Sequence, residues 1–294
     1  MQLLVLRIII FLALALAYML FDIFNNRNVP SYFAYASLVV GAVFTLLYLN
    51  LSQIFYSTLI AIATLGFGYV VYRIGQLGAA DVIEIAALSM IIPFMGKPLI
   101  YGVTQSYMPV ALSIAINSGI AALIVVPLYY IPKALHVKTP DYSKSKKQSN
   151  YFRIALIITV YAFFGAFLFS VLHASYAAIV LLAIIALGSA LVLAFEDRMM
   201  AYMSQYVTYK NMEPGDIIAT GMMKKREINV LEKKLVHFER LVGPELLKEL
   251  KTKLPSHKFP VYKKPIPFAV PIFIGVVATI AFGNVLLLLL PAYP

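Results

Sequence analysis

Eight apolar segments, most of them close to twenty residues long, constrain this chain more than any other feature of its sequence. They occupy approximately residues 3–21, 32–49, 54–72, 82–95, 108–131, 154–172, 176–195 and 267–290. A helix of about 20 apolar residues can cross the hydrocarbon core of a bilayer, because its backbone groups bond one another and need no water. We therefore predict an all-α, polytopic membrane helix bundle of about eight transmembrane helices, with a small cytoplasmic helical domain.

The overall composition agrees with a membrane protein. Hydrophobic residues make up 62% of the chain and charged residues 13%, whereas soluble domains average about 45–50% and about 25%. The first apolar segment runs directly into Asp22 and has no small-residue cleavage site at its end. We therefore interpret it as a retained span and not as a signal peptide.

The distribution of Lys and Arg predicts the orientation, because these residues favour the cytoplasmic side of a membrane. If the N-terminus lies outside and eight helices alternate, the cytoplasmic loops hold all but two of the 24 basic residues. The two exceptions are Arg7 and Lys97. The prediction is a plasma-membrane protein with both termini outside. Orientation and contact with anionic headgroups then account for the net charge of +11, and no nucleic-acid partner is expected.

The same pattern divides the chain into five parts. We predict a catalytic membrane core of five helices (1–131), a basic cytoplasmic linker (132–153), an additional helix pair (154–195), a cytoplasmic domain (196–266) and a last transmembrane helix (267–294). In the cytoplasmic domain, "REINVLEKKLVHFERLV" has apolar residues at helical spacing. The Gly-Pro at 243–244 interrupts this pattern before "ELLKELKTKL", so we expect a helical hairpin.

Three acidic residues do not suit a simple surface role. Asp22 ends the first span, Asp81 opens the fourth, and Glu84 follows Asp81 by one helical turn. In the predicted topology Asp22 and Asp81 lie at the same depth, at the cytoplasmic ends of their helices. Ionisable residues in such places are costly and often functional. Two structural alternatives remain open: Asp22 could lie in the headgroup layer, and Glu84 could make a polar contact between helices.

Two carboxyl groups brought together at a partly apolar site share one proton, which is the state that an aspartyl protease uses. The ionised group takes a proton from water, and the protonated group donates to the peptide carbonyl. Such chemistry needs no metal and no cofactor. The chain has no cysteine, and its sequence contains no HExxH, GxSxG or P-loop motif. The main rival is a carboxylate-gated ion or solute transporter, although the repeated halves typical of transporters are not evident.

Two motifs resemble those of a known family. "GAAD" at 78–81 resembles the GxGD motif of membrane aspartyl proteases. "DIFNNRNVPS", which begins at Asp22, is similar to the Asp…Arg-x-(Ile/Val)-Pro-Asn pattern of type IV prepilin peptidases and archaeal preflagellin (prearchaellin) peptidases, with Arg27 and Pro30 in the matching places. The two aspartates are 59 residues apart with two spans between them, as in that family. "EPGDIIA" and "KKPIPFAVPIFIGVVATIAFGN" also resemble segments of the archaeal members.

The resemblance implies a membrane aspartyl endopeptidase. Such an enzyme removes the short leader peptide from prepilin-like or prearchaellin precursors at the cytoplasmic membrane face. Asp22 and Asp81 would be the catalytic pair, and Gly78, Ala79 and Ala80 would form the loop that supports Asp81. Arg27 and Pro30 would belong to the supporting motif. We also expect Glu84 to contact a basic residue of the leader, where the low dielectric strengthens such a pair.

The sequence departs from the family pattern at three positions. Ala80 stands in place of the second motif glycine, Ile83 in place of the usual lysine, and Ser31 in place of asparagine. The four-cysteine zinc loop of the bacterial members is missing, so N-methyltransferase activity is not expected. An inactive homologue that acts as an assembly scaffold is a further alternative.

Overall fold

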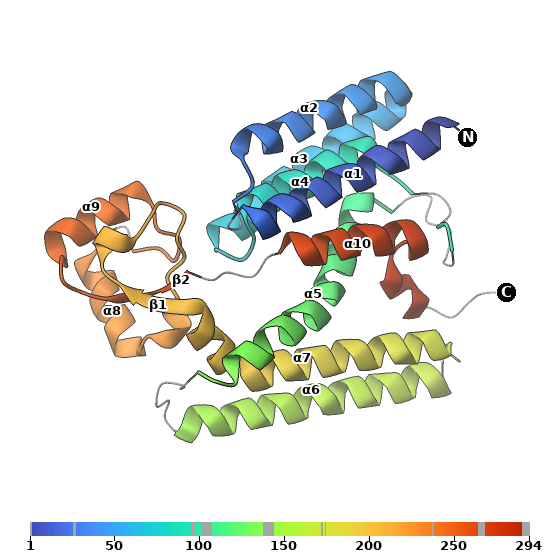
Figure 1. The fold of residues 1–294 in the computed structure, drawn as a ribbon. Helices are drawn as coiled ribbons and strands as arrows, with labels where there is room; N and C mark the ends of the chain where they lie inside the picture. Colours follow the sequence, from blue (N-terminus) through green and yellow to red (C-terminus); the bar gives the residue numbers. More distant parts are fainter. Residues whose placement is uncertain are drawn as a thin grey trace.

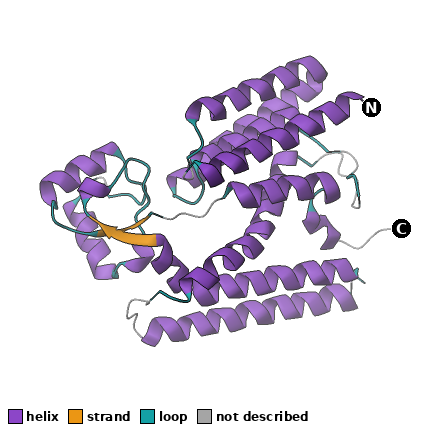
Figure 2. Ribbon diagram, in the orientation of Figure 1, coloured by secondary structure: helices purple, strands orange, loops and turns teal. Residues whose placement is uncertain are grey.

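The structure is a computed structural model that describes residues 2–25, 28–95, 98–100, 108–137, 144–171, 173, 175–236, 238–263 and 268–289. Within these residues the protein is all-α apart from one two-stranded sheet (Figure 2). Most helices form a bundle, and a small unit (residues 204–263) lies at one end of it (Figure 1). The start of α1 and the end of α10 lie at the other end. Long apolar helices of this kind identify a multi-pass membrane protein.

Six helices in the described part of the chain are long and apolar enough to cross a membrane. They are α1 (Gln2–Phe24), α2 (Ser31–Tyr48), α3 (Leu51–Arg73), α5 (Val110–Ala134), α6 (Lys144–Ser170) and α7 (Tyr176–Met203). The other two predicted spans form shorter helices, α4 (Ala79–Ile91) and α10 (Ala269–Phe282), of 13 and 14 residues. At 1.5 Å per residue, each reaches only about 20 Å. Among the described residues, six of the eight predicted spans are therefore long enough to cross the membrane as helices.

Local backbone chemistry explains why α4 and α10 are short. Pro93 follows α4, and a proline disfavours the helical conformation in the residue before it. Ile92 is accordingly extended, with φ −132° and ψ 91°. At the end of α10, Gly283 has φ 70° and ψ −141°, a conformation that glycine adopts readily and that ends the helix. A short 3-10 helix, η3 (Val285–Leu289), follows.

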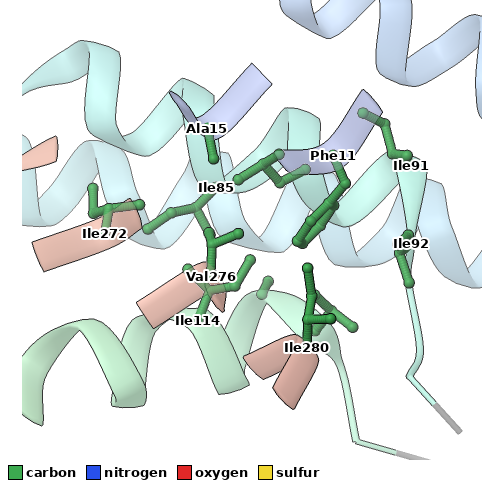
Figure 3. Close-up of a cluster of buried hydrophobic side chains, with 12 residues drawn as sticks. Phe11, Ala15, Ile85, Ile91, Ile92, Ile114, Ile272, Val276 and Ile280 are labelled. Carbon is green, nitrogen blue, oxygen red and sulfur yellow. The ribbon is translucent and has the colours of Figure 1, made fainter. Parts of the chain in front are cut away.

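Helix α4 lies inside the bundle, in contact with α1, α2, α3 and α5. Its packing against α3 depends on Gly68, because a Cβ atom added there would lie 2.2 Å from a methyl group of Val82. The main apolar core brings together side chains of α1, α4, α5 and α10, among them Phe11, Ile85, Ile114 and Ile272 (Figure 3). Helix α10, although last in sequence, is therefore part of the same core as α1–α5.

The predicted additional helix pair is longer than expected at both ends. Helix α6 begins at Lys144, inside the predicted linker, and α7 continues to Met203, inside the predicted cytoplasmic domain. Neither extension contains glycine or proline, so the helical backbone continues beyond the apolar stretch. Helix α7 packs against α5, and α6 packs against α7.

The small unit contains more than the predicted helical hairpin. Two helices are present, α8 (Lys225–Lys234) and α9 (Pro244–Lys253), but the amphipathic helix ends at Lys234 because Leu235 is extended. Strands β1 (Ser204–Val207) and β2 (Phe259–Tyr262) pair antiparallel, with Ser204 opposite Tyr262. Two 3-10 turns, η1 (Tyr209–Asn211) and η2 (Thr220–Met222), complete it. Its apolar core includes Ile218, Leu246 and Phe259, all almost fully buried.

Candidate functional site

A cavity of about 630 Å³ lies where the bundle meets the small unit. Its walls come from the end of α1, the segment before α2, the end of α3, the start of α4 and the residue before α10. Four residues of the small unit also line it: Gly215, Ile217, Leu241 and Tyr262. The cavity is therefore built by segments that are far apart in the chain. Both Asp22 and Asp81 line it.

Asp22 lies in the last turn of α1, and its side chain is buried. One carboxylate oxygen, Oδ2, accepts a hydrogen bond from the backbone N–H of Ala269 at 3.3 Å. Ala269 is the first residue of α10. The N-terminus of a helix carries partial positive charge and unsatisfied N–H groups, so this position stabilises a carboxylate. Helix α10 thus positions one half of the site.

Asp81 lies in the first turn of α4 and is half-buried. Its Oδ2 accepts a hydrogen bond from the backbone N–H of Gly78 at 3.0 Å. A Cβ atom added at Gly78 would approach that oxygen to 2.9 Å, so a glycine leaves room for the carboxylate. Gly78, Ala79 and Ala80 also line the cavity. All four residues of the "GAAD" motif therefore border the same cavity. The three residues before Asp81 do not form the expected loop, because Ala79 and Ala80 are the first two residues of α4 and only Gly78 precedes it.

The two aspartates come within electrostatic range of each other. They come from different helices and are 59 residues apart in the sequence. Among the described residues that line the cavity, they are the only charged ones. Two carboxyl groups in one cavity repel when both are ionised, so the arrangement favours the state in which one of them carries a proton. Such a pair can accept a proton from water and donate one to a substrate oxygen.

Glu84 occupies a different position from the two aspartates. Its side chain is fully buried and does not line the cavity. Neither carboxylate oxygen has a hydrogen-bond partner among the described residues. Glu84 is nevertheless within electrostatic range of both aspartates. This geometry does not provide the predicted contact between Glu84 and a basic leader, because the carboxylate has no access to the cavity.

The remaining predicted residues belong to the segment between α1 and α2. Arg27 lies outside the described residues. Pro30 precedes the first residue of α2 and has φ −59°. It does not line the cavity, but its neighbours Val29 and Ser31 do. Pro30 therefore shapes the chain beside the cavity without contributing a surface to it.

Several residues near the site escaped the sequence-based prediction. Tyr18 is four residues before Asp22 on the same face of α1, a spacing that could have identified it. It is buried, and its hydroxyl hydrogen bonds to that of Ser37 at 2.8 Å. Tyr262 comes from β2, and burial raises the pKa of its phenol, while the hydrogen-bonded Arg240 opposes this shift. No local signal marks Tyr262, because its place depends on the fold of the small unit.

Comparison of the chain with models of protein families, with curated proteins and with solved structures finds no match.

Proposed function

We propose that the protein is a membrane aspartyl endopeptidase that removes a short leader peptide from prepilin-like or prearchaellin precursors. The observation that carries this proposal is the meeting of Asp22 and Asp81 in a single cavity at the end of the helix bundle. The resemblance of "GAAD" and "DIFNNRNVPS" to the peptidase motifs supports the same function. The aspartates of these two motifs are the same two residues that line the cavity.

The proposed reaction is the hydrolysis of one peptide bond. A water molecule held between Asp22 and Asp81 gives a proton to the ionised carboxylate as its oxygen attacks the peptide carbonyl carbon. The protonated carboxyl donates its proton to the carbonyl oxygen. The tetrahedral intermediate then collapses: one of its hydroxyl groups gives a proton to the ionised carboxylate as the carbonyl forms, the C–N bond breaks, and the nitrogen receives the proton of the other carboxyl. The pair again holds one proton. No side chain forms a bond to the substrate.

The proposed membrane placement follows from the distribution of charge. All eight apolar helices would lie in the bilayer, with α4 and α10 as short members in the core of the bundle. The small unit and the cavity would face the cytoplasm, where the positive-inside rule places most Lys and Arg residues. Anionic headgroups would contact these basic segments. The cut would then fall next to a substrate helix that stays in the bilayer.

The decisive experiment is the cleavage of a prepilin-like precursor by the purified protein in detergent. We expect Asp22→Asn and Asp81→Asn each to reduce the cleavage rate by at least about 10³-fold, because the pair acts as a unit. Glu232→Gln is the control, since Glu232 is exposed on α8, outside the cavity. If either asparagine variant cleaves the precursor at the wild-type rate, the assignment of Asp22 and Asp81 as the catalytic pair is wrong.

The carboxylate-gated transporter is the second candidate, and the group of three acids favours it. Asp22, Asp81 and Glu84 lie within electrostatic range of one another, and groups of acids in membranes often mark ion or proton paths. Reconstituted protein would then carry cation flux in liposomes without any precursor, and would leave precursors uncut. An inactive assembly scaffold would show neither activity.

A further inference from the structure

The cavity opens between α2 and α3, at the surface of the bundle that faces lipid in a multi-pass membrane protein. Tyr35 of α2 and Tyr72 of α3 both line the cavity, and so does Ile83 of α4. Tyr35 is 63% exposed, although it belongs to a helix of full spanning length. Tyrosine is common where membrane helices meet the lipid–water interface. The cavity that contains Asp22 and Asp81 therefore reaches the bilayer at this opening.

Helices α2 and α3 are tied together at the end of α4 that is remote from Asp81. The short connection at residues 49–50 joins them there. The hydroxyl of Thr45 in α2 donates a hydrogen bond to the carbonyl of Met90 in α4 at 2.8 Å, and the hydroxyl of Ser57 in α3 donates to the same carbonyl at 3.5 Å. From this point each helix packs more extensively against α4 than against the other. Helix α4 is therefore the floor of a groove between α2 and α3, and the groove leads to the cavity.

The side chain of Ile83 belongs to the floor of this groove. Its neighbours in the sequence, Val82 and Glu84, are buried, whereas Ile83 is only half-buried. Val82 packs against α3, because a Cβ atom added at Gly68 would collide with it. Ala79 lies one helical turn before Ile83 on the same face of α4, is exposed, and also lines the cavity. Where the groove meets the cavity, its floor thus presents one small and one apolar side chain.

These features fit an apolar helix that arrives from within the bilayer. Small residues such as Ala79 let the backbones of two membrane helices approach closely. The small unit closes the cavity on another side with a wall of Ile217, Leu241 and Tyr262, which faces the cytoplasm in the proposed orientation. A transmembrane helix cannot enter on that side, because its apolar surface would have to cross water. The opening between α2 and α3 needs no such transfer.

We propose that the groove between α2 and α3 holds the membrane helix of the substrate, with its first turns on Ala79 and Ile83 and with Tyr35 and Tyr72 on either side. The proposal rests on the peptidase function proposed above. It assigns the groove to the part of the substrate that follows the cut and stays in the bilayer. A helix bound there meets the cavity at its end, so the bond before the helix reaches the two aspartates.

The test is site-specific photo-cross-linking in membrane vesicles that contain a prepilin-like precursor. The photoreactive amino acid p-benzoylphenylalanine replaces Tyr35 in one variant and Tyr151 in another, each with Asp22→Asn so that the precursor stays uncut. Tyr151 is the matched control, because it is a tyrosine of the spanning helix α6 that is 64% exposed and lies outside the cavity. We expect an adduct with the precursor at position 35, located by mass spectrometry in its membrane helix, and loss of this adduct at position 151.

A second arm changes the floor of the groove. Ile83→Trp adds a bulky ring there, and we expect it to lower kcat/KM for the precursor by about 10-fold, mainly through KM, which is the scale of a poor steric fit at a packed contact. The same substitution should weaken the adduct at position 35. Ile83→Leu, which keeps the side-chain volume, should retain most of the activity and the adduct.

The outcomes separate the groove from the peptidase function. If the wild-type protein cuts the precursor but positions 35 and 151 give equal adducts, the groove assignment alone is overturned. An adduct at position 35 that lies in the leader, contains only lipid or joins two copies of this chain has the same meaning. If the wild-type protein cuts no precursor, the peptidase function is wrong, and the proposed occupant of the groove with it.

Discussion

At the scale of single residues, the three acids of the site have three different environments. Asp22 accepts a hydrogen bond from the N-terminus of α10, and Asp81 accepts one from the N-terminus of its own helix. Glu84 is buried with no hydrogen-bond partner among the described residues. Partnered carboxylates can stay at a site without large cost, whereas an unpartnered buried one destabilises the fold. Of the three acids, Glu84 is therefore the one whose burial we expect to lower the stability of the fold.

We expect Glu84→Leu to stabilise the protein by about 1–3 kcal/mol, because an apolar side chain removes the cost of burying an unpaired polar group. The measurement is thermal unfolding of the purified protein in detergent. Ile85→Ala, at the next position of α4, should instead destabilise by about 2–4 kcal/mol because it leaves a cavity in the core. If Glu84→Leu is also destabilising, Glu84 has a partner, such as a bound water, that the fold requires.

At the scale of elements, α4 is short and has a polar interaction at each end. Asp81 accepts from Gly78 at its N-terminus. At its C-terminus, the guanidinium of Arg7 in α1 donates to the carbonyl of Ile91 through both Nε, at 2.8 Å, and Nη2. The last carbonyls of a helix have no partner within the helix. A cation there also interacts favourably with the helix dipole. Arg7 therefore ties α1 to α4 at the ends of these helices that are remote from Asp22 and Asp81.

Removal of the contact between Arg7 and the carbonyl of Ile91 should destabilise the packing of α4 against α1. We expect Arg7→Met to destabilise the protein by about 1.5–3 kcal/mol, the usual contribution of a hydrogen bond to a charged group. Arg7→Lys should lose less, because it keeps the charge. Arg153→Met is a suitable control, since Arg153 is exposed on α6. Chemical or thermal unfolding in detergent gives the comparison, and equal stabilities of Arg7→Met and the wild type would contradict the role of Arg7.

At the scale of the whole molecule, one end of the bundle differs from the other. The small unit and the cavity lie at one end, and the start of α1 and the end of α10 lie at the other (Figure 1). The small unit is rich in Lys and Arg, whereas the loop between α2 and α3, around Asn50, contains no basic residue. This asymmetry is the physical basis for the proposed orientation, in which the small unit faces the cytoplasm.

Because the chain contains no cysteine, single cysteines can report this orientation without background. We expect Asn50→Cys to react with a membrane-impermeant maleimide added to intact cells. Glu232→Cys, on α8 of the small unit, should react only after the cells are opened. The opposite pattern would show that the cavity faces outward, and would exclude cytoplasmic cleavage of precursors.

Some features were predictable from the sequence because they depend on local chemistry. The apolar segments determine which parts of the chain can be membrane helices, and the positions of Asp22 and Asp81 beside their ends follow from the sequence alone. Glycine and proline also mark the ends of α4 and α10. The length of α10 was harder to predict, because apolar residues continue beyond Phe282 and composition does not show where the helix stops.

The tertiary structure decided what depends on contacts between distant segments. Hydrophobicity along a helix does not tell which neighbour it meets, so the joint placement of Asp22 and Asp81 in one cavity required the packing of α1, α4 and α10. Strands β1 and β2 are separated by about fifty residues, and each is only four residues long. Their pairing, and the wall of Ile217, Leu241 and Tyr262 that it supports, depends on a non-local hydrogen-bond ladder that no local pattern encodes.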